Sequence, residues 1–163
     1  MLSDTHLTAA TVDRMPAEVW SMAEAADVVL HAGDVVEAAV LSALSDRAPV
    51  HAVLGNNDRG IRLPEVLELE LGGVRLAMVH DSGARTGRER RLARRFPTAG
   101  VVVFGHSHAP LVEGGLDGQL LVNPGSPTQR RRQPVHTVAE LELVDGEVRR
   151  AELIEVGSLA ASG

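Results

Sequence analysis

The chain has 163 residues, of which 44% are hydrophobic and 23% charged, a balance typical of one packed globular domain. It contains no cysteine, and its 16 basic residues are all arginines, which excludes disulfides, thiolate nucleophiles and lysine Schiff bases. The net charge of −6 and the scarcity of aromatic rings argue against nucleic acid as a stable partner.

The sequence shows no sign of a membrane segment or a signal peptide. No apolar run approaches the roughly 18 residues that a membrane span needs. The opening residues, Met1-Leu2-Ser3-Asp4, have neither a basic nor an apolar region. We therefore expect a cytoplasmic protein with no membrane partner, with one domain over 1–156 and a frayed tail over 157–163. Association into a homo-oligomer stays open.

Helical patterns alternate with short apolar runs along the first two thirds of the chain. Met1 and Leu2 precede the first polar motif, and this apolar segment is shorter than a central strand usually is. Pro16 suits the opening turn of a helix, and Thr86 with Glu89 would form a capping box. In chain order the pattern predicts a helix at 16–26, a strand at 27–32, a helix at 36–44, strands at 50–54 and 74–79, a helix at 87–96 and a strand at 101–104.

The last third of the chain changes character, because strands follow one another there. They are expected at 120–122, 138–144 and 148–156, and Asp145-Gly146 is a strong hairpin signal between the last two. Alternating strands and helices followed by antiparallel strands predict an α/β core with an added sheet.

Polar residues with ligand chemistry follow directly after the expected strands. Because ligands bind outside the carboxyl ends of strands in α/β sheets, these groups could share one crevice. Residues at i and i+2 of an extended chain lie on one face, and glycines ahead of the ligands would let the backbone approach closely. The motifs are Asp4-Thr5-His6, Gly33-Asp34, Gly55-Asn56-Asn57-Asp58, His80-Asp81 and Gly105-His106-Ser107-His108.

The motifs supply two carboxylates, one amide oxygen and four imidazoles. Without sulfur, this donor set suits Mn, Fe, Zn, Ni or Co. It exceeds what one ion needs and matches two ions that share a carboxylate. The candidate metal ligands are Asp4, His6, Asp34, Asn56, His80, His106 and His108.

The order Asp-x-His, Gly-Asp, Gly-Asn-x-Asp, His, Gly-His-x-His resembles the calcineurin-like metallophosphoesterase superfamily. The short length and the motif Asn123-Pro124-Gly125-Ser126 resemble its compact branch of small phosphodiesterases, which includes relatives of the retromer small subunit. The resemblance implies an α/β fold of two facing mixed β-sheets flanked by helices, a four-layer α/β/β/α sandwich.

The resemblance also implies a site and a reaction. Asp4, His6 and His108 would hold one metal, Asn56, His80 and His106 a second, and Asp34 would bridge them. The implied reaction is hydrolysis of a small phosphodiester by a hydroxide held between two divalent ions. Mn²⁺ is the first expectation, with Ni²⁺, Zn²⁺, Fe²⁺, Co²⁺ or Mg²⁺ as alternatives.

One departure from the family pattern concerns the proton donor. Many members carry histidine where this chain has Asn57, which donates hydrogen bonds but transfers no proton near neutral pH. Catalysis would then rest on the metals, with Asn57 and Arg59 steadying the phosphate oxygens. Asp58 is a further catalytic candidate, with capping of its loop as the alternative.

Two other functions fit parts of the pattern. A non-catalytic protein-interaction scaffold of the retromer-subunit type would keep the fold, but it has no need of seven filled ligand positions. A phosphomonoesterase would have to neutralise a dianionic phosphate with arginines. We interpret His31, His51 and His136 as structural, 88–95 as a solvated arginine face, and Arg130-Arg131-Arg132 as a surface loop rather than a phosphate contact.

Overall fold

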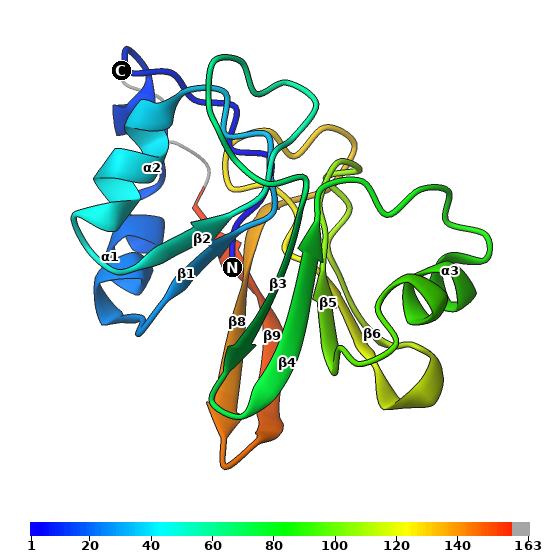
Figure 1. Ribbon diagram of the computed structural model, residues 1–163. Coiled ribbons are helices and arrows are strands. Elements are labelled where there is room, and N and C mark those ends of the chain that lie inside the picture. The colour runs from blue at the N-terminus through cyan, green and yellow to red at the C-terminus, as the bar shows by residue number, and fades with distance from the viewer. Residues whose placement is uncertain (158–163) are drawn as a thin grey trace.

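Two β-sheets face each other at the centre of the fold, and helices cover the outer face of each (Figure 1). The computed structural model describes residues 1–157. Helices α1 (Ala17–Ala25) and α2 (Ala38–Ser45) lie on one side, and α3 (Arg88–Arg95) lies on the other. This is the predicted four-layer sandwich.

The larger sheet has five strands in the order β3-β4-β5-β7-β6. Its three central strands are parallel, and the edge strands β3 and β6 pair antiparallel to them. Central strands buried on both faces read as continuous apolar runs, as the three valines of β5 do. The bounds are β3 Val66–Leu71, β4 Val74–Val79, β5 Val101–Val103, β6 Leu111–Gly114 and β7 Leu120–Asn123.

The second sheet is assembled around the first two residues of the chain. Leu2 pairs in parallel with His31, and Met1 exchanges backbone hydrogen bonds with Ala139. These two residues therefore join the parallel pair β1-β2 to the hairpin β8-β9. The bounds are β1 Val29–His31, β2 Val50–Ala52, β8 His136–Val144 and β9 Glu147–Val156.

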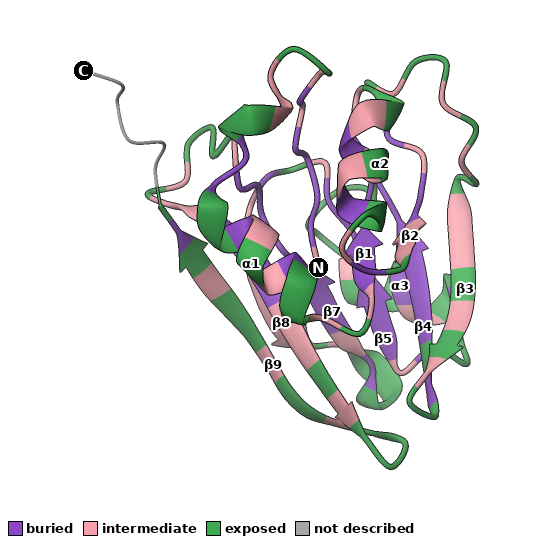
Figure 2. Cartoon of the chain, turned by 90° about the vertical axis from the view of Figure 1, so that its left-hand side faces the viewer, coloured by how far each residue is buried: buried purple, intermediate pink, exposed green. Residues whose placement is uncertain are grey.

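Three apolar clusters hold the four layers together. Leu30, Leu76 and Val103 belong to the cluster between the sheets. Val19 and Leu44 belong to the cluster under α1 and α2, and another cluster lies under α3. Each fully buried side chain of this size contributes roughly 1.5–3 kcal/mol. Figure 2 shows the inner strands β1, β4, β5 and β7 buried, while β3 and β9 are partly exposed.

Most predicted elements are confirmed, and three details differ. Strands β3 and β6 were not assigned from sequence, although Val66–Leu71 alternates in the way an edge strand does. The capping box is wrong: α3 has Gly87 at its N-cap with a φ of 71°, and no side chain of the described residues caps it. The left-handed backbone there favours glycine, which places Thr86 one residue too early. The Arg91 guanidinium instead binds the carbonyls of the preceding loop.

Two further predictions concern a membrane-spanning segment and the C-terminal end of the chain. Among the described residues, no helix is long and apolar enough to cross a membrane. The last strand, β9, ends at Val156. All but the first residue of the predicted tail lies outside the described residues.

Candidate metal centre

The five predicted motifs meet at the carboxyl ends of the parallel strands. Residues 1–2 lead into Asp4, β1 into Asp34 and β4 into His80, while β2 and β5 lead into the other two loops. In Figure 1 these loops lie together at the upper end of the two sheets. The topology therefore brings seven side chains from distant parts of the sequence to one place.

Three of them form a set that we call the buried set: Asp4, His6 and His108. Asp4 Oδ1 lies 3.2 Å from His108 Nε2 and 3.9 Å from His6 Nε2. Within residues 1–157 these three atoms are buried and have no hydrogen-bond partner. Buried polar atoms left unpaired cost about 1–3 kcal/mol each, so their convergence fits a metal ion.

The other three form the open set: Asn56, His80 and His106. Asn56 Oδ1 lies 3.1 Å from His80 Nε2 and 2.9 Å from His106 Nδ1. Asn56 is exposed and His106 half-buried, while His80 is buried, so this set reaches solvent through Asn56 and His106.

Asp34 lies between the two sets. Its Oδ2 is 3.4 Å from His6 Nε2, and its Oδ1 is 3.4 Å from His80 Nε2. Ligand atoms of Asp4, Asp34 and His80 also lie within 4.8 Å of one another. One carboxylate thus touches both groups of ligands, as a bridging ligand would.

Backbone carbonyls fix the orientation of two of the histidines. His80 Nδ1 lies 2.7 Å from the Ala32 carbonyl, and His108 Nδ1 binds the Gln129 carbonyl. Since a carbonyl can only accept, both Nδ1 atoms carry the proton. The Nε2 lone pairs are then directed into the centre, in the tautomer that a metal requires.

The ligands occupy an unusual backbone conformation. Five of the seven have positive φ angles between 46° and 66°: Asp4, His6, Asp34, His106 and His108. The expectation that i and i+2 converge because the chain is extended is therefore wrong. Left-handed turns bring these side chains together, at a cost of roughly 1–3 kcal/mol for each strained residue.

The glycines before the ligands do permit close approach, as predicted. A Cβ on Gly55 would lie 2.0 Å from the Asp34 nitrogen, and one on Gly105 would lie 1.8 Å from Ser3 Oγ. Gly33 has a φ of 92°, and a Cβ there would lie 2.7 Å from His80 Nδ1. Any side chain at these positions would displace the ligand loops.

Both carboxylates are held in the charged form. Burial works to raise the pKa of Asp34, but contact with the His80 ring and hydrogen bonds from Asn57 outweigh it and hold that pKa well below its usual range. Burial likewise opposes ionisation of Asp4, yet contact with His108 lowers its pKa. The two anions make a negative pocket suited to cations.

Comparison with known proteins places the chain in a family. A model described as the calcineurin-like phosphoesterase superfamily domain matches residues 1–146. The chain belongs to this superfamily. A probable metallophosphoesterase of Methanothermobacter thermautotrophicus is 32% identical to it over an alignment of 163 positions. The alignment covers 97% of this chain and 92% of the relative.

Solved structures share the fold of this superfamily member. A single mutant of Vps29 from Entamoeba histolytica superposes with a TM-score of 0.74 and 20% identity over 96% of this chain and 97% of that one. An archaeal phosphodiesterase superposes with a TM-score of 0.68 and 21% identity over 94% and 97% of the two chains.

The residues after Asn56 support the Asp34 carboxylate in this member of the superfamily. Asn57 donates from its backbone nitrogen to Asp34 Oδ1 (2.8 Å) and from Nδ2 to Oδ2 (2.6 Å). Asp58 accepts hydrogen bonds from Val36 N (2.6 Å) and Gly55 N (2.7 Å), which tie two ligand loops together. The structure thus gives Asp58 a positioning contact.

Two exposed arginines lie in or against the ligand loops. Arg59 follows Asp58 in the loop that carries Asn56, and its side chain is exposed. The Arg131 guanidinium donates to the His106 carbonyl at 3.2 Å. The loop of three arginines is therefore at the surface, as predicted, but one of its members contacts a ligand residue.

The superfamily member also has supporting residues whose roles the sequence left unassigned. Ser126 Oγ donates to the Asp4 carbonyl (2.7 Å) and accepts from Gln129 N (2.8 Å), so it supports the buried set from two sides. Asn123 Nδ2 binds the Gly105 carbonyl at 3.1 Å. The motif at 123–126 was the available signal, and its role is to clamp the ligand loops.

His31 is a core residue, as interpreted from sequence, and it also contacts the ligand segment. It is fully buried, and its Nε2 lies 3.0 Å from Thr5 Oγ1, between two ligands of the buried set. Burial lowers the pKa of His31 to about 4, so it is neutral at physiological pH.

Proposed function

We propose that this chain is a metal-dependent phosphodiesterase acting on small phosphodiesters. The observation that carries the proposal is the convergence of seven nitrogen and oxygen ligands into two sets that share Asp34. With Asp34 counted in both, each set offers four donors, which fits two divalent ions completed by water. The donors contain no sulfur and suit Mn²⁺ first, with Ni²⁺, Zn²⁺, Fe²⁺, Co²⁺ or Mg²⁺ as alternatives.

The two ligand sets differ in how accessible they are to a substrate. Bound divalent ions would supply Lewis acidity, which makes water nucleophilic near neutral pH and offsets charge on the phosphoryl oxygens. The buried set holds its ligands away from solvent, while the exposed Asn56 and half-buried His106 leave room for a substrate. Arg59, in the loop of Asn56, and Arg131, against the His106 carbonyl, are two exposed cations that could contact its phosphate.

The hydrogen bonds of Asn57 shape the preference for substrate. Its amide group is committed to Asp34 and carries no proton that could protonate a leaving alkoxide. The leaving group must then depart without help from this side chain. We therefore expect faster hydrolysis of diesters with acidic leaving groups.

A substrate panel tests the proposal. Hydrolysis of bis(p-nitrophenyl) phosphate and p-nitrophenyl phosphate would be measured with Mn²⁺, Ni²⁺, Zn²⁺ and Mg²⁺, alongside the bound metal content. We expect the diester to be preferred, and Asp34→Asn to abolish its hydrolysis. Asp13→Asn is the matched control, because Asp13 is exposed in the 3-10 turn Val12–Arg14.

Two outcomes would overturn the proposal in favour of a rival. Preference for the monoester would indicate a phosphomonoesterase. A protein loaded with two ions that hydrolyses neither ester would indicate a non-catalytic scaffold of the Vps29 type, whose fold this chain shares.

A further inference from the structure

One exposed arginine lies against both ligand sets of the metal centre. The Arg131 guanidinium donates to the carbonyl of His106, a ligand of the open set, at 3.2 Å. Its charge also reaches the buried set, because burial lowers the pKa of His6 and the nearby charges of His108 and Arg131 lower it further. Arg131 is itself exposed. It therefore lies at the rim of the centre, within reach of a molecule bound across the two sets.

The local structure around Arg131 favours a role in binding an anion. Its backbone φ of 51° lies in the left-handed region, which is strained for a residue other than glycine. The His106 carbonyl takes one of the five N–H groups of the guanidinium, so several donors remain. Within residues 1–157 the ion pairs of arginine involve Arg47 and Arg150, so no carboxylate of the described chain neutralises Arg131. A strained, unneutralised cation beside a ligand residue is well placed to bind an anion from solution.

The charge balance of the loaded centre indicates how much negative charge a substrate should bring. Among the seven candidate ligands only Asp4 and Asp34 are anionic, because imidazole and amide ligands are neutral. Two divalent ions exceed these two carboxylates by two positive charges, which the attacking hydroxide and a monoanionic diester offset. Asp58 and Arg59 are neighbours in one loop and offset each other. The charge of Arg131 is then left without a counter-charge.

The oxygens of the transferred phosphate lead to the same conclusion. A phosphodiester has two oxygens without an ester group, and two metal ions can take one each. A guanidinium at the rim is then left without an acceptor on that phosphate. A carboxylate or a second phosphate elsewhere on the substrate would offer two oxygens in the geometry of the guanidinium fork. The substrate that fits is therefore a diester with a second negative charge.

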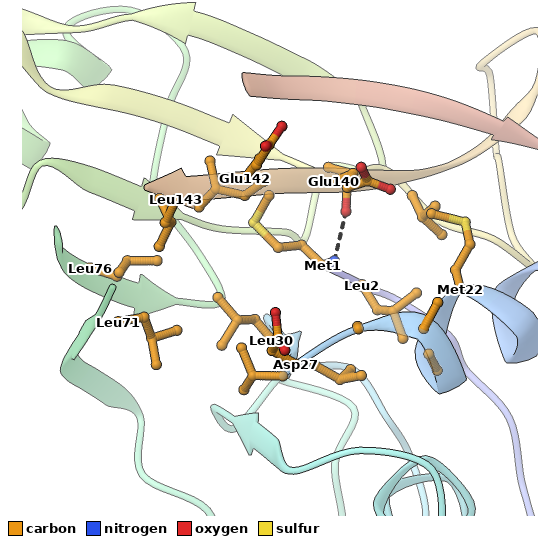
Figure 3. A pocket seen from close by; sticks show the side chains of 18 of the residues that line it. Met1, Leu2, Met22, Asp27, Leu30, Leu71, Leu76, Glu140, Glu142 and Leu143 are labelled. Atoms are coloured by element: carbon orange, nitrogen blue, oxygen red, sulfur yellow. Dashed lines mark hydrogen bonds between the residues drawn. The ribbon is translucent and has the colours of Figure 1, made fainter. Parts of the chain in front are cut away.

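A large cavity elsewhere in the fold is unsuited to that second charge. It has a volume of about 780 Å³ and lies at the amino ends of β1 and β4, away from the metal centre. Figure 3 shows aliphatic side chains such as Leu30 and Leu76 around it, together with the acidic Asp27, Glu140 and Glu142. Carboxylates repel an anion, so the arginine at the rim is the better partner.

We propose that Arg131 binds a second anionic group of the substrate, so that the preferred substrates are small phosphodiesters with a carboxylate or phosphate within a few bonds of the transferred phosphate. This inference rests on the proposed phosphodiesterase function, and it narrows the contact suggested there for Arg131 to this second charge. The main alternative is a monoester, whose third oxygen without an ester group carries the additional charge on the phosphate itself.

Two diesters that differ in one charge test the proposal. In 4-nitrophenyl 3-carboxyphenyl phosphate the second anion is present, and in 4-nitrophenyl 3-carbamoylphenyl phosphate a neutral amide of similar shape replaces it. We expect the Mn²⁺-loaded protein to hydrolyse the carboxylate with a kcat/KM about tenfold higher, through a lower KM. Arg131→Gln should reduce this ratio to about one, with the bound metal unchanged. Arg131→Lys, which keeps the charge without the fork, should retain part of it.

Two exposed arginines supply matched controls for the loss of one positive charge. Arg132→Gln changes the next residue of the same loop, and Arg94→Gln removes a charge from α3 on the outer side of the larger sheet. Both variants should keep the tenfold ratio. A reduced ratio in Arg94→Gln would show general attraction of anions by the protein surface and would overturn the specific contact.

Binding without turnover provides a second readout. The methyl ester of (3-carboxybenzyl)phosphonate has a stable carbon–phosphorus bond and a poor leaving group, so the loaded protein should bind it unchanged. By calorimetry we expect it to bind about tenfold more tightly than its carboxamide analogue. This difference should disappear in Arg131→Gln and persist in Arg132→Gln.

The remaining outcomes separate this proposal from the function on which it rests. Equal kcat/KM for the two diesters in the unaltered protein, or an equal loss for both in Arg131→Gln, would overturn the role of Arg131 and leave a phosphodiesterase. A loss confined to p-nitrophenyl phosphate would assign Arg131 to the third oxygen of a monoester instead. Hydrolysis of neither diester would contradict the phosphodiesterase function, and the phosphonate titration would then decide the role of Arg131 by itself.

Discussion

The two ligand sets of the metal centre are built differently, although they share Asp34. Asp4 and His108 of the buried set are inaccessible; the Ser126 hydroxyl binds the Asp4 carbonyl, and the Gln129 carbonyl binds the His108 ring. Asn56 of the open set is exposed and contacts two histidines. We propose that the buried set retains one ion while the open set meets the substrate, and four experiments test this division.

The largest effect is expected from loss of a buried ligand. His108→Asn removes a nitrogen that points at Asp4, and we expect hydrolysis to be lost and bound metal to fall from two ions to one or fewer. His106→Asn, in the open set, should keep one tightly bound ion. Metal content after gel filtration, measured with activity, checks both. Equal retention of metal by the two variants would contradict the division into sets.

A histidine in place of Asn57 tests whether a side chain at this position can protonate the leaving group. Asn57→His places a proton donor beside Asp34, and general-acid help contributes about 10²-fold or more. We expect the rate on diesters with poor leaving groups to rise by about 10²-fold, and the dependence of rate on leaving-group pKa to become shallower. Asn57→Gln, which keeps an amide, is the control. An unchanged dependence in both variants would show that this position does not reach the leaving group.

Removal of a support beneath the buried set should have a smaller effect. Ser126→Ala breaks the contacts that hold Asp4 and the Gln129 turn, and loss of such an outer contact typically costs 10–100-fold in metal affinity. We expect about a tenfold loss, measured by titration with Mn²⁺. Ser21→Ala on the exposed face of α1 is the matched control. An unaltered affinity in Ser126→Ala would mean that the 123–126 clamp is not needed.

The smallest expected effect is a change in the free energy of unfolding with pH, caused by protonation of His31. Its folded pKa of about 4 lies below the usual 6.5, so the unfolded chain binds the proton more readily and stability falls as pH drops from about 6.5 toward 4. This group alone should lower the free energy of unfolding by about 1 kcal/mol between pH 7.5 and 6. Urea unfolding at both pH values checks it, and His31→Gln should remove that part of the slope.

The candidate ligand residues could be identified from the sequence, but the backbone conformation that brings them together could not. The seven candidate ligands could be picked out because each follows an apolar strand and because the motifs occur in a fixed order. Their convergence by left-handed backbone at Asp4 and His6 was not predictable, since the extended pattern of the sequence suggested the opposite. The capping box at Thr86 failed for a related reason, because a positive φ at Gly87 moved the start of α3.

Composition by itself excluded thiolate and lysine chemistry and left histidine, carboxylate and amide groups as the candidate metal donors. These properties are local, since apolar runs and ligand motifs can be read within a few residues. The tertiary structure decided which candidate ligand atoms lie together, that Ser126 clamps Asp4, and that the short segment Met1-Leu2 joins two halves of a sheet. Those relations depend on contacts between residues from 24 to 138 positions apart, which local pattern does not encode.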